Sequence, residues 1–201
     1  MQSHGSRLLG LVRASAIALY GAPHFPTGGT DQVYGLDAAR FLADLDEPDQ
    51  LVLSLYGQLA AGMTRGTFVA GEGASVAPLH GLAFRAMYLP PNATANAAFL
   101  ETLRLSLVHE TGSGLELAFA TPRGWLAPGK TIEVAAAPTR FGPVSFTLTA
   151  RAGGVDVSLD PPPRARTLRL RLRLPHGTRT LDLSGRGGHL ELRVGVNRSI
   201  P

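Results

Sequence analysis

The chain contains 201 residues, of which 44% are apolar and 17% are charged. A chain of this length and composition can bury roughly 70% of the surface that its unfolded form exposes, so disorder throughout is excluded. Because the sequence contains no cysteine, a disulfide scaffold and a thiolate metal site are excluded as well.

The net charge of +4 is distributed unevenly along the chain. Residues 1–112 contain 6 arginines and 9 acidic residues, whereas residues 113–201 contain 13 basic and 6 acidic residues. The 24 glycines and 15 prolines indicate short elements joined by many loops. The sequence therefore predicts two chemically distinct parts.

The first apolar segment covers residues 8–22, and no stretch reaches the roughly 18 to 20 apolar residues of a membrane span. This segment is similar to the core of a signal peptide, but Arg13 lies in its middle, which a secretory core rarely tolerates. The preferred interpretation is a short amphipathic helix over residues 8–20. We therefore expect a soluble chain without a signal peptide, a transmembrane segment or a membrane partner, and its compartment is left open.

Four further segments in the first part have apolar residues at helical spacing. One starts at Pro48, which suits the first position of a helix, and another has Asn92 as its N-cap and Gly112 as its exit. The predicted helices cover residues 36–45, 48–62, 79–88 and 92–112. The buried faces expected of the second and the last contain Leu51, Val52, Leu55, Tyr56 and Leu59, and Phe99, Leu100, Leu103, Leu107 and Val108.

From Gly114 onward, apolar residues alternate with polar ones, which is the pattern of strands with one buried face. Glycine or proline turns separate the strands at intervals of about 8 to 12 residues, as in an antiparallel sandwich. Helices followed by strands predict an α+β fold, with antiparallel helices over 1–112 and an antiparallel β-sandwich over 113–201. The predicted strands cover residues 114–119, 132–134, 144–149, 155–160, 168–174, 181–183 and 190–194.

Five arginines follow one another closely in the second part: Arg164, Arg166, Arg169, Arg171 and Arg173. Because alternate residues of a strand share a face, the last three would form a positive stripe with a spacing of about 7 Å. Such a stripe can attract polyanions; alternatively, it is a solvated face or pairs with carboxylates such as Asp156 and Glu191. No aromatic residue follows Phe146 to stack between the charges, so we favour the second interpretation and expect no nucleic-acid partner.

Glu72 stands between two glycines in the segment 71–75, after one predicted helix and before the next. Glycines allow the backbone to approach a ligand closely. Carboxylates on loops at helix ends are common acid or base positions in enzymes that act on sugars. The alternative is a tight turn with a solvent-facing glutamate. Glu72 is therefore a candidate base or sugar-binding carboxylate.

His24 and Asp31 flank the segment 27–30, which has the sequence Thr-Gly-Gly-Thr and precedes a predicted helix. They could line a pocket that binds hydroxyl groups, or they could cap the helix, which we favour. Asp31 is the one carboxylate that we single out as a possible catalytic partner of Glu72. The segment is not a phosphate-binding loop, because it lacks the Gly-Lys-Ser/Thr ending.

Three further side chains have groups suited to sugar binding, namely Arg85, Tyr88 and Trp125. Trp125 is the only tryptophan and lies where the predicted helices give way to strands. An indole can stack on a sugar ring, but we favour a role in anchoring the two parts to each other. None of the six histidines is at ligand spacing with another, so we expect neither a metal site nor a cofactor.

Four stretches of the sequence together carry a resemblance to a known type of protein. They are Gly71-Glu72-Gly73-Ala74-Ser75-Val76-Ala77-Pro78, Met87-Tyr88-Leu89-Pro90-Pro91-Asn92, Phe99-Leu100-Glu101-Thr102-Leu103-Arg104-Leu105 and Pro138-Thr139-Arg140-Phe141-Gly142-Pro143-Val144-Ser145. Together they resemble the C-terminal part of large bacterial proteins of the six-hairpin glycosidase type. Such proteins have an α/α toroid of paired helices with β-sandwich modules packed against it. The resemblance spans most of residues 20–175.

This resemblance implies a carbohydrate-related chain whose sugar cleft is lined by loops at one end of a toroid. In such families a carboxylate on a loop between late helices often serves as base or binds the sugar, and Glu72 is the position that matches. A complete toroid contains more helices than this sequence supplies, and a glycosidase needs two carboxylates that face one bond. We therefore expect a C-terminal portion or a truncated gene product, which alone is not a competent catalyst.

The alternative is a non-catalytic module that binds carbohydrate or protein or has a structural role. In this interpretation the sandwich docks to a partner and the helices cover it. An incomplete array of helices leaves apolar helix faces without neighbours, so we also expect self-association.

Overall fold

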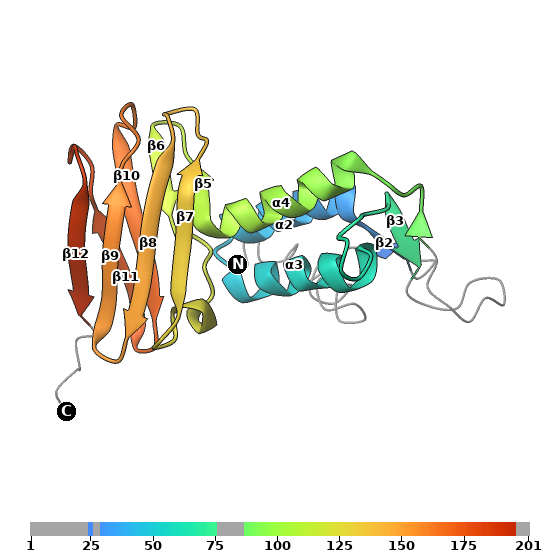
Figure 1. Ribbon diagram of the computed structural model, residues 1–201, viewed down its shortest axis with the longest axis horizontal. Helices are drawn as coiled ribbons and strands as arrows, with labels where there is room; N and C mark the ends of the chain where they lie inside the picture. Colours follow the sequence, from blue (N-terminus) through green and yellow to red (C-terminus); the bar gives the residue numbers. More distant parts are fainter. Residues whose placement is uncertain (1–23, 26–28, 76–86, 196–201) are drawn as a thin grey trace, which may run out of the picture. The chain divides into compact units, whose positions relative to one another are not determined.

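The computed structural model describes residues 24–25, 29–75 and 87–195. The chain divides into two compact units, residues 1–106 and 107–201, and each is described by itself (Figure 1). Helices predominate in the described part of the first unit and strands in that of the second, so the predicted α+β fold is confirmed. Within the described ranges, no helix combines the length and the apolar character that crossing a membrane requires.

Three α-helices form the framework of the described part of the first unit: α2 (Gln32–Asp44), α3 (Pro48–Gly62) and α4 (Ala93–Leu107). They confirm three of the predicted helices, and α3 has the predicted bounds. Asn92 caps α4 as expected, because its Oδ1 accepts a hydrogen bond of 2.9 Å from the Ala95 amide. The helix predicted over residues 8–20 and most of the one predicted over 79–88 lie outside the described residues.

Two of the predicted helices extend too far along the chain. The helix predicted over residues 92–112 ends at Leu107, and strand β5 (Val108–Glu110) follows it at once. Val108 is buried and pairs with Leu117 of the next strand, so pairing within a sheet outweighs continuation of the helix. Met87–Tyr88, at the end of the helix predicted over 79–88, likewise form a strand, β4.

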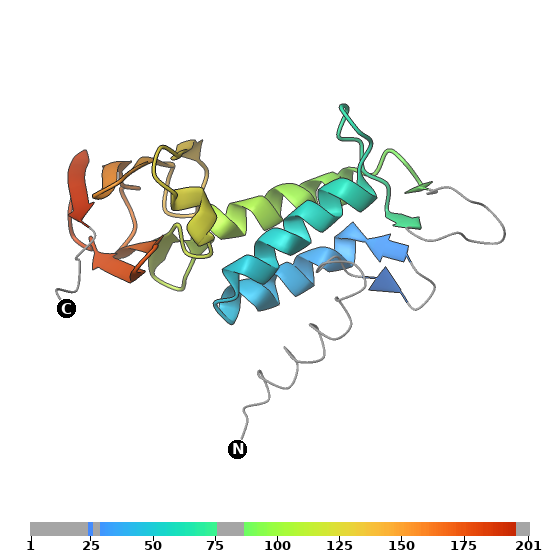
Figure 2. The ribbon, with the colours of Figure 1, turned by 90° about the horizontal axis from the view of Figure 1, so that it is seen from below.

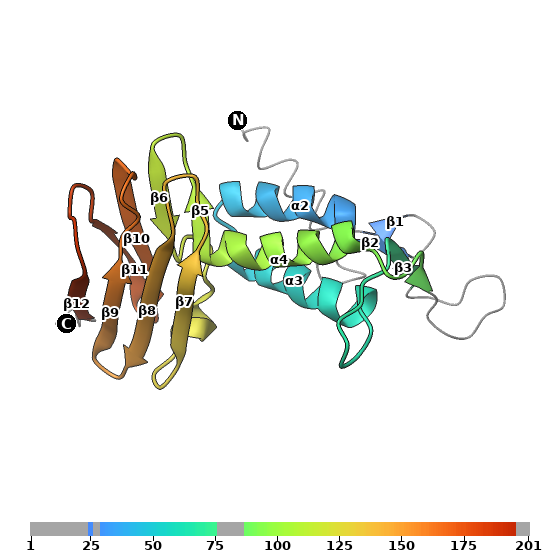
Figure 3. The same cartoon turned by 45° about the horizontal axis from the view of Figure 1, so that its top comes forward.

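The buried faces of α3 and α4 differ from the predicted ones. Tyr56 and Leu100, both expected inside, are 51% and 62% exposed. Figure 3 shows α3 and α4 side by side, and Gln58 Nε2 of α3 donates a hydrogen bond of 3.5 Å to Thr102 Oγ1 of α4. This contact between α3 and α4 is therefore polar. The buried polar side chains of the two helices are Ser54, Gln58, Thr102 and Ser106.

A small sheet that the sequence did not predict completes the first unit. It consists of β1 (His24–Phe25), β2 (Gly29–Asp31), β3 (Gly73–Ser75) and β4, paired antiparallel in that order. Each strand has only two or three residues, which is too short for an alternating pattern to stand out. The sheet brings together segments that lie far apart in the sequence.

The second unit contains two four-stranded sheets. One has the order β11-β10-β6-β5 and the other the order β12-β9-β8-β7. Every segment that was predicted as a strand contains one, but the pairing of β6 with β10 is parallel, so the prediction of a wholly antiparallel module is wrong there. The bounds are β6 (Gly114–Leu117), β7 (Thr131–Ala137), β8 (Val144–Arg151), β9 (Gly154–Asp160), β10 (Thr167–Leu174), β11 (Gly177–Asp182) and β12 (Leu190–Gly195).

One hydrophobic core joins the two sheets of the second unit. Figure 1 shows the sheets face to face. Their inner faces contribute alternate residues, because successive side chains of a strand point to opposite faces. The arrangement is that expected of a sandwich. The buried contributors include Leu115, Leu117, Leu168, Leu170 and Leu172 from one sheet, and Phe146, Leu148, Val155, Val157 and Leu159 from the other.

Candidate functional site

Three helix ends meet beside the small sheet in the first unit. A hydrophobic cluster joins the start of α2, the end of α3 and the start of α4, and strands β2 and β3 contact α3. We call the small sheet, residues 63–72 and residues 89–92 the loop end. The buried members of the cluster are Met63, Ala70 and Ala95, and Val33, Leu59 and Phe99 pack against them.

The register of the small sheet brings together candidates that are distant in the sequence. Asp31 of β2 pairs with Gly73 of β3, and Gly73 pairs with Tyr88 of β4. Positions 31, 73 and 88 therefore form one row across three strands, in which neighbouring strands are about 4.8 Å apart. Residues directly opposite one another occupy the same face of a sheet. Two predicted site positions thus flank a glycine that has no side chain.

Glu72 precedes this row directly. It lies at a bend just before β3, and its side chain is exposed, whereas Gly71 and Gly73 on either side of it are buried. The buried glycines keep the backbone against the helices, and the carboxylate extends into solvent. The register therefore places positions 31, 73 and 88 in one row, and Glu72, whose side chain is exposed, directly precedes the middle position.

The other predicted site residues do not join this group. His24 of β1 pairs with Thr30, one position away from Asp31, so it lies outside the row. Arg85 lies outside the described residues. Trp125 belongs to the second unit, where it is half-buried in the 3-10 helix η2 (Arg123–Leu126).

A hairpin between α3 and β3 forms the tip of the loop end. Met63 bridges to Ala70, and the Thr64 amide donates a hydrogen bond of 2.9 Å to the Val69 carbonyl. The side chain of Asn96 on α4 holds the returning strand, because its Oδ1 accepts from the Ala70 amide at 2.9 Å and its Nδ2 donates to the Phe68 carbonyl at 3.1 Å. Figure 2 shows this hairpin projecting from the end of α3.

Two large apolar side chains are exposed at the loop end, although sequence reasoning singled out neither. Phe68 in the hairpin is 55% exposed and Leu89 in the turn after β4 is 71% exposed. Both residues have left-handed backbones, with φ of 53° and 45°. Bulky side chains rarely adopt this conformation. No periodicity could have found these positions, because each is set by a turn.

The arginine stripe of β10 is largely a structural feature. Arg173 is only 4% exposed, and its guanidinium donates hydrogen bonds to the carbonyls of Phe119 and Thr121. Arg171 lies over the Phe119 ring, 5.4 Å from its centroid. Arg169 is exposed and forms an ion pair of 3.6 Å with Glu116 of β6. The expected carboxylate pairing is thus found for one arginine, but with a different partner, and the burial of Arg173 was not predicted.

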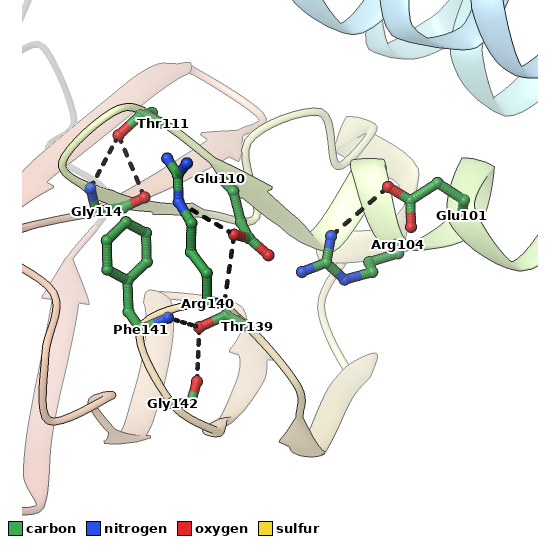
Figure 4. A network of polar contacts seen from close by, with 9 residues as sticks. All are labelled: Glu101, Arg104, Glu110, Thr111, Gly114, Thr139, Arg140, Phe141 and Gly142. Carbon is green, nitrogen blue, oxygen red and sulfur yellow. Dashed lines mark hydrogen bonds and ion pairs between the residues drawn. The ribbon is translucent and has the colours of Figure 1, made fainter.

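The segment 138–145, which contributed to the resemblance, forms a structured turn between β7 and β8 (Figure 4). Thr139 Oγ1 donates to the Gly142 carbonyl at 2.6 Å and accepts from the Phe141 amide at 3.1 Å. Arg140 Nε lies 3.5 Å from Glu110 Oε2 of β5, so the turn connects one sheet of the second unit to an edge of the other. These contacts give the residues of this segment a structural role in holding the turn.

A second titratable cluster lies on the exposed face of β9 and β12. His189 Nδ1 is 2.8 Å from Asp160 Oδ1, and His189 Nε2 is 2.8 Å from Glu191 Oε1. Hydrogen bonds to these two carboxylates raise the pKa of His189, and the bond to His189 lowers the pKa of Glu191. Sequence reasoning missed this cluster, although His189 and Glu191 are two residues apart. Across the described residues, no group of His, Asp and Glu side chains is arranged to hold a metal ion.

Comparison with known proteins adds no assignment to this geometry. No protein-family model and no curated protein matches the chain.

Proposed function

We propose that this chain is a portion of a glycoside hydrolase-like, carbohydrate-active protein that binds sugar at the loop end and is not catalytically complete alone. The observation that carries the proposal is the row formed by Asp31, Gly73 and Tyr88 with the exposed Glu72 directly beside it. In this proposal the helices are part of an α/α toroid and the second unit is a β-sandwich that supports it.

The chemistry of this neighbourhood favours binding over bond cleavage. Carboxylates accept strong hydrogen bonds from hydroxyl groups, which are the groups that a sugar presents in greatest number. A general acid for glycoside cleavage needs a closed, apolar environment that raises its pKa. Glu72 is exposed to solvent, so within this chain its supported role is to hold a sugar hydroxyl.

The proposal is tested by titrating the full chain with neutral oligosaccharides of defined linkage and following its amide NMR signals. We expect signals from the loop end to shift. Glu72→Gln should weaken binding about tenfold, because a hydrogen bond to a charged group contributes about 1.5 kcal/mol or more. Glu133→Gln is the matched control, since Glu133 is exposed on β7 of the second unit. Absence of binding, or equal weakening by both variants, would contradict the proposal.

A non-catalytic module that associates with itself is the second candidate function. The observation that favours it is the outward position of apolar side chains on the helices, with Leu53, Tyr56 and Leu100 exposed. Light scattering after size exclusion should then show an oligomer that Tyr56→Ser dissociates. A monomer at every concentration would remove this candidate.

A further inference from the structure

We infer that the phenyl ring of Phe68 is the platform on which a pyranose ring of a bound oligosaccharide stacks at the loop end. This inference rests on the proposed function and adds to it the contact with the apolar face of the sugar. Glu72 and its neighbours can hold hydroxyl groups, but they offer no surface for C–H groups.

The position of Phe68 is unfavourable for a residue without a function there. More than half of its surface is exposed, so the free energy that burial of a phenyl ring normally contributes is not realised. Its φ of 53° lies in the left-handed region, where glycine or asparagine is more stable than phenylalanine. Backbone strain of this kind is concentrated at ligand-binding sites.

The hairpin holds the backbone of Phe68 in a defined place. The Phe68 amide donates to the Thr64 carbonyl at 3.1 Å, and the Phe68 carbonyl accepts from Asn96 Nδ2. On the next residue, the Val69 amide donates to Thr64 Oγ1 at 2.9 Å. A backbone fixed in this way loses little conformational entropy when a ligand binds, which favours affinity.

Phe68 and Glu72 are parts of one short segment whose middle is fixed on both sides. Between them, Ala70 is completely buried and its amide and carbonyl bond to Asn96 and Asn92 of α4. The exposed Leu89 lies in the neighbouring turn, three residues before Asn92. The segment therefore exposes an apolar ring and a carboxylate four residues apart, and in this inference one ligand contacts both.

A pyranose fits this combination because it presents two kinds of surface. Its C–H groups form an apolar face that matches the negative face of an aromatic ring. Its hydroxyl groups lie around the edge and can reach a carboxylate beside the ring. Exposed Arg65, in the same hairpin, is a further hydrogen-bond donor to ring or hydroxyl oxygens.

The test compares Phe68→Gly, Phe68→Trp and Tyr56→Ala in the full chain, with the oligosaccharide that binds the unmodified chain best. Phe68→Gly removes the ring and suits the left-handed backbone, so thermal stability should be equal or higher while binding weakens about tenfold. Phe68→Trp should retain or strengthen binding. Tyr56→Ala removes an aromatic ring of similar exposure from α3 and should leave binding unchanged.

The outcomes separate this inference from the proposed function. If Glu72→Gln weakens binding but Phe68→Gly does not, the platform is wrong and the proposed function stands. If no oligosaccharide binds the unmodified chain, both are wrong. If Phe68→Gly changes only the oligomeric state, the ring is a protein contact and the inference is overturned.

Discussion

The two units bury their side chains in different ways. In the second unit, leucine, valine and phenylalanine at alternate positions of two sheets fill one continuous core. In the first unit, α3 and α4 bury serine, threonine and glutamine where they meet, while Tyr56 and Leu100 are exposed. The second unit therefore has a continuous apolar core of its own, whereas the helices of the first unit leave large apolar side chains exposed. This contrast is what the proposal of an incomplete toroid explains.

The largest expected effect comes from the core of the second unit. Leu148 is fully buried, so Leu148→Ala should lower the free energy of unfolding by about 4 kcal/mol through lost burial and the remaining cavity. Urea denaturation followed by the fluorescence of Trp125, the single tryptophan, reports on this unit. Leu53→Ala on the exposed side of α3 should cost the first unit less than about 0.5 kcal/mol, measured by the loss of helical circular dichroism in urea. Equal losses for the two variants would contradict the contrast between the units.

The parallel pair β6–β10 provides the next effect. A Cβ atom at Gly114 would lie 1.7 Å from the Thr167 carbonyl oxygen, so Gly114→Ala should force the strands apart and destabilise the second unit by about 3 kcal/mol. Gly112→Ala is the control, because nothing lies within 4 Å of a Cβ atom there. The same fluorescence measurement distinguishes the two. A small effect of Gly114→Ala would mean that β6 and β10 can separate at a lower cost in free energy than close-packed strands should allow.

The polar interior of the first unit leads to a stabilising substitution. Gln32 is 1% exposed, and within the described part of the chain neither polar atom of its side chain has a hydrogen-bond partner. Gln32→Met should therefore raise the free energy of unfolding by about 1 kcal/mol, measured by the loss of helical circular dichroism in urea. Gln50→Met, at a half-buried position of α3, should change it by less than about 0.5 kcal/mol. A loss of stability at Gln32 would show that its amide is satisfied by water.

The smallest effect concerns pH and the second unit. Because the pKa of His189 is raised above its ordinary value of 6.5, its contacts with Asp160 and Glu191 stabilise the folded state fully below that value. This contribution disappears as the pH rises through the raised pKa. His189→Gln should remove this dependence of the melting temperature on pH, and His176→Gln, at an exposed turn, should preserve it. The side chains of His189, Asp160 and Glu191 are exposed, so salt should weaken the effect.

Local patterns explain which predictions were correct. Alternation located every predicted strand of the second unit, because a strand with one buried face must repeat every two residues. Pro48 and Asn92 located helix starts, because each acts on the backbone within one turn. Leu51 and Leu55 are buried as expected, whereas Tyr56 and Leu100 are exposed, because periodicity marks a helix face without showing what covers it.

The candidate site likewise has one part that the sequence predicts and another part that it does not. Glu72 could be singled out from its flanking glycines alone, and it is indeed an exposed carboxylate on a loop. Its neighbours could not be identified, because the row of positions 31, 73 and 88 depends on the register of strands that have two or three residues. Phe68 was missed for a related reason, since it lies in a hairpin whose backbone is held by Asn96 of α4, which is distant in the sequence.

The amino-acid sequence by itself determined the three helices and the strands from residue 114 onward, because these depend on the alternation, caps and turns of neighbouring residues. Only the tertiary structure decided that β6 pairs parallel with β10, that Arg173 is buried against the Phe119 and Thr121 carbonyls, and which residues surround Glu72. These outcomes depend on contacts between distant segments. Such contacts form only where packing compensates for the entropy of closing the chain between them.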